Sequence, residues 1–108
     1  MEKNKIELAC FEIIAYSGEA KALFLEAYDC ALELNYDLAN SKIKEGKTLL
    51  NKTHQAHMEL LTIEAQEEKS NISLLLVHAE DQFMSAENAL IMAEKMLLFI
   101  KKFESKLT

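Results

Sequence analysis

The sequence contains no arginine, proline or tryptophan, and glycine and cysteine each occur only twice in 108 residues. β-Sandwiches, β-barrels and flexible linkers depend on turn residues such as glycine and proline, so this scarcity leaves an all-α fold. Without arginine there is no planar guanidinium group for bidentate phosphate contacts, and the formal charge of −6 opposes binding to a polyanion. Nucleic acid is therefore not an expected partner.

The chain also lacks a long hydrophobic run. Its apolar stretches are far shorter than the roughly 20 residues needed to cross a bilayer, and its first residues lack a signal-peptide cleavage pattern. Half of the residues are hydrophobic and 28% are charged, which suits a chain that buries a core. We expect residues 1–108 to form one acidic domain in the cytoplasm, without direct insertion into a membrane.

Apolar residues recur every three to four positions in three stretches, which is typical of amphipathic helices. The first stretch predicts a helix from about Lys3 to Leu34. The pattern breaks at residues 34–36, where Asn35 is a suitable N-cap for a second helix. This second helix is expected to end near residues 66–69.

The third helix is expected to begin after a cap at Ser70 or Asn71 and to run through Phe103. Two tight connections between long helices predict an antiparallel three-helix bundle with up-down-up topology. Residues 74–77 and 89–92 are apolar in nearly all directions around this helix. Because a lone bundle buries one stripe per helix, the additional apolar surface predicts self-association.

The first predicted helix contains both cysteines and one of the glycines. Cys10 and Cys30 are 20 residues apart, or roughly 30 Å along a helix, which is too far for a disulfide. We expect free thiols that fill the core, since neither has a lysine or histidine spaced to activate it. Gly18 is unfavourable inside a helix, and we interpret it as a point where another helix comes close.

Histidine is the main candidate for chemistry, because the sequence has no glycine-rich phosphate loop and no Cys-x-x-Cys motif. His78 lies in an apolar stretch of the third helix, with Asp81 one turn further along the same face and Glu80 turned roughly 160° away. Such an imidazole can be a general base, a metal ligand or a phosphoryl acceptor. A hydrogen-bonded core or interface histidine is the commoner role in such a stretch.

His54 and His57 are three residues apart on the second helix, a spacing that allows both to contact one metal ion. They suit the polar flank of the helix equally well. A small metal-binding bundle that uses His54, His57 and Asp81 is therefore one alternative, and its subunit would unfold when the metal is removed. A non-enzymatic helical module that self-associates through the third helix is another alternative.

Three blocks of the sequence carry a resemblance to a known family. They are FEIIAYSGEAK at residues 11–21, the segment from KEG to His54 at residues 44–54, and VHAEDQFM at residues 77–84. Together they resemble the enzyme IIA component of the lactose/cellobiose class of the bacterial sugar phosphotransferase system. The resemblance implies a homotrimer of three-helix subunits, a phosphocarrier histidine at His78, and Asp81 from each subunit around a divalent metal ion, Mg²⁺, on the threefold axis.

The resemblance also implies the reaction partners. Phospho-HPr is the expected donor, a cysteine of the cognate enzyme IIB is the expected acceptor, and no nucleotide takes part. The sugar is expected to be a β-linked disaccharide such as cellobiose, chitobiose or lactose.

The chain departs from the family pattern around this site. The family usually reads His-Ala/Gly-Gln-Asp-His-Leu-Met in the third helix, whereas this chain has Glu80, Gln82 and Phe83 in place of Gln, His and Leu, and His57 where the family has glutamine. Gln82 can still offer an amide donor to a phosphate, although it cannot become charged. A carboxylate close to phosphohistidine would repel it, so Glu80 is expected to face a neighbouring subunit or solvent.

Overall fold

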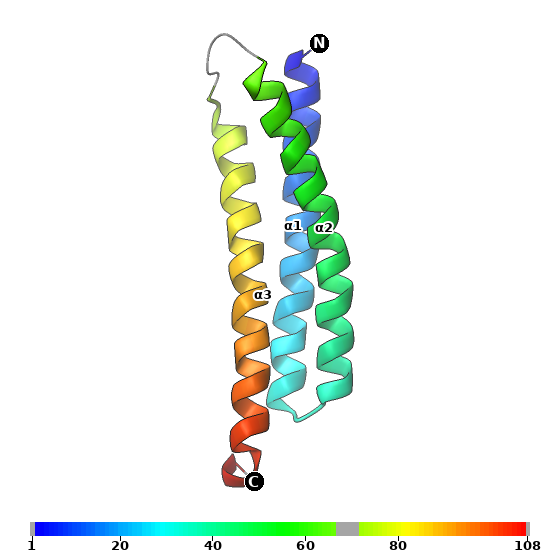
Figure 1. The fold of residues 1–108 in the computed structure, drawn as a ribbon, viewed down its shortest axis with the longest axis vertical. Helices are drawn as coiled ribbons and strands as arrows, with labels where there is room; N and C mark the ends of the chain where they lie inside the picture. Colours follow the sequence, from blue (N-terminus) through cyan, green and yellow to red (C-terminus); the bar gives the residue numbers. More distant parts are fainter. Residues whose placement is uncertain (1, 67–71, 108) are drawn as a thin grey trace.

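A computed structural model describes residues 2–66 and 72–107, and these residues form three α-helices. Helix α1 spans Glu2–Leu32, α2 spans Tyr36–Ala65 and α3 spans Leu74–Leu107. The helices lie side by side in an antiparallel rod of 59 × 18 × 18 Å (Figure 1). The predicted all-α, up-down-up bundle is confirmed, and no described helix is long and apolar enough to cross a membrane.

The turn between α1 and α2 ends the first helix two residues before its predicted end at Leu34. Leu34 has a φ of 61°, which turns the chain out of the helix. The N–H of Asn35 donates to the carbonyl of Cys30, and that of Leu34 to the carbonyl of Ala31, each at 2.9 Å. The side chain of Asn35 accepts from the N–H of Leu38 at 3.3 Å, so Asn35 is confirmed as the N-cap of α2.

The start of α3 lies later than the sequence pattern predicts. The helix begins at Leu74, and the hydroxyl of Ser73 accepts a hydrogen bond from the N–H of Leu76 at 3.1 Å. This contact makes Ser73 the cap of the helix. The predicted caps, Ser70 and Asn71, lie outside the described residues.

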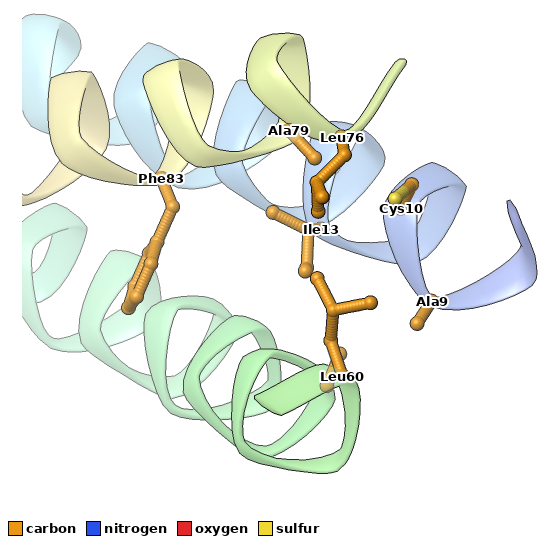
Figure 2. Packing of buried hydrophobic residues seen from close by; sticks show 8 residues of the cluster. Ala9, Cys10, Ile13, Leu60, Leu76, Ala79 and Phe83 are labelled. Carbon is orange, nitrogen blue, oxygen red and sulfur yellow. The ribbon is translucent and has the colours of Figure 1, made fainter. Parts of the chain in front are cut away.

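The core nearest the beginning of α3 receives side chains from all three helices (Figure 2). Ile13 of α1 lies between Leu60 of α2 and Leu76 of α3, and Phe83 extends from α3 toward α2. The other buried members of this cluster are Ala9, Cys10, Ala56 and Ala79. These contacts fix which face of α3 points inward over residues 76–83, and they leave the opposite face exposed.

The close helix approach within the bundle occurs at Gly46 and not at Gly18. The ring of Phe24, which is fully buried, packs against Gly46 so tightly that a Cβ atom there would overlap it. Gly18 is exposed, and no atom lies within 4 Å of the position that its Cβ would occupy. Within one chain, the interpretation of Gly18 as a close-approach point is therefore wrong.

Candidate functional site

His78 lies on the outer face of α3, in its second turn. The imidazole is exposed, whereas Leu76 and Ala79 of the same helix are buried in the core. It lines a shallow hollow together with Leu74 and Leu75 of the first helical turn. The positive end of the helix dipole lies at this turn and favours a negatively charged group.

Asp81 is also exposed, but it faces a different hollow. This is a groove of 580 Å³ between α2 and α3, lined by His57, Leu61, Glu64, Ile72, Leu76, Val77, Glu80, Asp81 and Met84. Over residues 2–66 and 72–107, no hydrogen bond or ion pair joins His78 to Asp81. A separation of three residues rotates one side chain about 60° from the other. Within a single chain, the two side chains therefore line different hollows.

His57 of α2 and Glu80 of α3 form a hydrogen-bonded pair, with 2.7 Å between Nε2 and Oε1. The side chain of His57 is only 15% exposed, and its ring centroid lies 4.8 Å from that of Phe83. Glu80 was expected to face solvent or a neighbouring subunit; within this chain its carboxylate instead reaches α2 and pairs with His57, while 38% of its side chain stays exposed. The sequence signal that could have indicated this pair is a basic and an acidic residue that border the core stripes of adjacent helices.

The two histidines of α2 do not converge on a common ion. His54 is exposed and its ring centroid lies 6.2 Å from that of Phe83, whereas Nε2 of His57 is occupied by Glu80. In the part of the chain that the structure describes, no group of three or more His, Cys, Asp or Glu side chains is arranged to hold a metal ion. The metal-binding alternative that uses His54, His57 and Asp81 is not supported.

Cys10 lies beneath the candidate site, and both cysteines are free thiols, as expected. Burial raises the pKa of the Cys10 thiol, and the negative charges of Glu80, Glu64 and Glu7 raise it further. A thiol with a raised pKa holds little reactive thiolate at neutral pH. Cys10 is therefore core filler, as predicted.

Gln82 lies one turn beyond His78 on the same helix and is half-buried. This placement keeps its amide near the His78 face of α3. The three residues singled out on α3 thus lie within about one turn: Gln82 shares a face with His78, whereas Asp81 lines the groove between α2 and α3.

Comparison with known proteins gives a consistent result over nearly the whole chain. Residues 8–101 match the family described as "PTS system, Lactose/Cellobiose specific IIA subunit". The lactose-specific EIIA component of Staphylococcus aureus (strain N315) is 30% identical over 102 residues, which cover 94% of this chain and 99% of that protein. The lichenan-specific phosphotransferase enzyme IIA component of Bacillus subtilis (strain 168) is 31% identical over 99 residues, with coverages of 92% and 90%.

A solved structure is similar over the same extent. The crystal structure of the cellobiose-specific enzyme IIA from Bacillus anthracis matches with a TM-score of 0.87 at 33% sequence identity. The match covers 94% of this chain and 93% of that chain.

Proposed function

Since the chain belongs to the lactose/cellobiose-specific IIA family, whose members are phosphocarrier components of the sugar phosphotransferase system, we propose that it carries the phosphoryl group on His78. The observation that supports this assignment is the exposure of the His78 imidazole in a hollow beside the first turn of α3. The side chain of His57 is largely buried and paired with Glu80, so it is less accessible to a protein partner.

The proposed reaction is two successive transfers. A ring nitrogen of His78 attacks the phosphorus of the phosphohistidine on HPr, and the N–P bond of the donor breaks as the new N–P bond forms. The phosphoryl group then moves to the thiolate of a cysteine on enzyme IIB, with loss of the N–P bond and formation of a P–S bond. No nucleotide takes part, because phosphohistidine is already an activated donor. We propose the cytoplasm as the location and a β-linked disaccharide as the transported sugar.

The charges around His78 indicate what the partners must supply. The lysines of α3 begin at Lys95, 17 residues or roughly 25 Å beyond His78, and the chain has no arginine. Gln82 is proposed to donate an amide N–H to the phosphate, which gives no positive charge. Phosphoryl transfer requires neutralisation of the negative charge on the equatorial oxygens. We therefore propose that the docked partners contribute most of this positive charge.

A homotrimer is the proposed assembly, because α3 presents a second, exposed apolar stripe. The exposed hydrophobic side chains of α3 include a series in which every spacing after the first is seven residues: Leu74, Val77, Met84, Ile91 and Leu98. Asp81 falls on the same stripe, between Val77 and Met84. A repeat of seven residues is typical of helices that pack around a common axis.

Three copies of Asp81 on one axis would repel one another unless a cation offsets their charge. The exposed carboxylate of Asp81 fits this role, because hard divalent cations such as Mg²⁺ bind carboxylate oxygens. The ion would supply charge neutralisation at the axis of the assembly.

A single incubation tests the phosphocarrier assignment. The purified chain is mixed with phosphoenolpyruvate, enzyme I and HPr, and its intact mass is measured. We expect one phosphoryl group per chain in the wild type and none in His78→Ala. In His54→Ala and His57→Ala, the final extent of phosphorylation should be largely unchanged. A label that follows His54 or His57 would overturn the assignment. No phosphorylation of an intact wild-type trimer would favour the non-enzymatic helical module.

A further inference from the structure

The link between His57 and Glu80 lies where the bundle is least tightly held. α1 packs against both other helices, whereas α2 and α3 meet much less extensively. Near the beginning of α3, the 2.7 Å contact between His57 and Glu80 bridges these two helices. A second ion pair, Lys47 to Glu94 at 3.0 Å, joins the same helices 14 residues further along α3, and both of its side chains are about half exposed.

The side chains around the link restrict the movement of the His57 imidazole. Phe83 packs its ring beside His57, and the His57 side chain is 15% exposed, so the imidazole has little freedom to move. The Glu80 side chain is 38% exposed and reaches across the groove between α2 and α3. A hydrogen bond in a partly dehydrated setting contributes more than an ion pair whose two side chains are about half exposed, such as Lys47 to Glu94.

The position of Glu80 relative to His78 explains how the contact with His57 can affect the orientation of His78. Two residues along a helix correspond to 200°, so Glu80 and His78 project to nearly opposite sides of α3. The link therefore holds one side of the second helical turn against α2 and directs the other side, with His78, outward. It does so within two turns of the start of the helix, where helices fray most readily.

We propose that His57 and Glu80 are positioning residues, whose contact fixes the orientation of the α3 turn that presents His78 to its partners. This inference rests on the proposed function of His78. It assigns Glu80 an indirect role, since its carboxylate is directed to α2 and away from the phosphoryl group.

A double-mutant cycle tests the proposal. Transfer from phospho-HPr is measured for His57→Ala, Glu80→Ala and the double variant at saturating donor. We expect each single variant to lower kcat by about tenfold with little change in KM, because misorientation slows transfer more than docking. The double variant should be no slower than the single variants, because both remove the same contact. Lys47→Ala, which breaks the exposed ion pair, is the matched control and should transfer at the wild-type rate.

Two further measurements separate the possible outcomes. Hydrogen exchange of the peptide over residues 74–84 should become faster in both single variants, while that over residues 90–106 stays unchanged. A variant with glutamine at both positions, His57→Gln with Glu80→Gln, should restore transfer to within about twofold, because two amides can hydrogen bond across the same gap. Additive rate losses, or slower transfer without faster exchange, would overturn the proposal. Wild-type protein that is never phosphorylated on His78 would refute the proposed function, and unchanged exchange would refute the link independently.

Discussion

Burial separates the two cysteines of α1 chemically. Cys10 is fully buried beneath α3, whereas Cys30 is only partly buried near the other end of the helix. Alkylation requires a thiolate, and the raised pKa of Cys10 reduces its thiolate fraction at pH 8. We expect iodoacetamide to modify Cys10 at least about tenfold more slowly than Cys30 in the folded protein, with the Cys10 rate increasing as the pH rises.

Peptide mapping by mass spectrometry measures this difference. The same experiment in denaturant is the control, since both thiols should then react at similar rates. Equal rates in the folded protein would contradict the buried placement of Cys10.

At the level of single residues, the sequence identified the positions but not all of their contacts. His78, Asp81 and Gln82 could be placed on α3 from helical periodicity, which depends only on local spacing. The contact between His57 and Glu80 joins residues 23 positions apart on antiparallel helices, so it depends on how α2 and α3 are rotated against each other. Periodicity gives the rotation of each helix only to within a broad apolar stripe.

Gly46 is the residue on which the packing of α1 against α2 depends. A methyl group at Gly46 would overlap the ring of Phe24, which has no free space because it is fully buried. Gly46→Ala should therefore lower the free energy of unfolding by about 1–3 kcal/mol, even though alanine favours a helix by about 1 kcal/mol. Urea denaturation followed by circular dichroism measures the change.

The compensating variant is Phe24→Leu, which makes room at the same contact. We expect Gly46→Ala to lower the free energy of unfolding by less in the Phe24→Leu background than in the wild type. An equal cost in both backgrounds would show that the Phe24 ring is not the cause.

The helices themselves were predictable, and their ends were less so. Three amphipathic stripes predicted three helices, and Asn35 was correctly placed as the N-cap of α2. Helix α1 ends early because Leu34 adopts a positive φ, a conformation that glycine usually occupies and that the sequence therefore does not indicate. The start of α3 was predicted too early, because Ser73 and the two upstream candidates are equally suitable caps by residue type.

Gly18 connects the single chain to its proposed assembly. It lies on an exposed stripe of α1 whose hydrophobic members are Leu8, Phe11, Leu25 and Leu32. With no atom of its own chain nearby, Gly18→Ala should preserve or increase helicity. If a neighbouring helix packs here, the added methyl group should weaken self-association by about tenfold or more, a cost of about 1.4 kcal/mol.

Sedimentation over a concentration series measures the trimer, and circular dichroism measures the helices. Asn51→Ala, an exposed polar position on α2, is the control and should not alter self-association. An unchanged trimer in Gly18→Ala would exclude this stripe from the interface.

The axial role proposed for Asp81 predicts a metal-dependent assembly. The wild-type trimer should loosen when a chelator removes divalent cations, because the three carboxylates then repel one another. Asp81→Leu should form a trimer that is insensitive to the chelator, because it replaces the three charges with apolar side chains. Light scattering at micromolar concentration distinguishes these states, and a monomeric wild-type protein would contradict the proposed assembly.

The narrow cross-section of the rod limits how well a single chain can shield a phosphoryl group from water. A bundle that is 18 Å across has a core only about one side chain deep, so it has no interior in which an activated group can be sheltered. A phosphoryl group on the exposed His78 of an isolated chain would therefore lie open to attack by water. The lifetime of a phosphorylated His78 must then depend on surfaces of other chains that shield the phosphoryl group from water. These chains are either neighbouring copies or the donor and acceptor proteins.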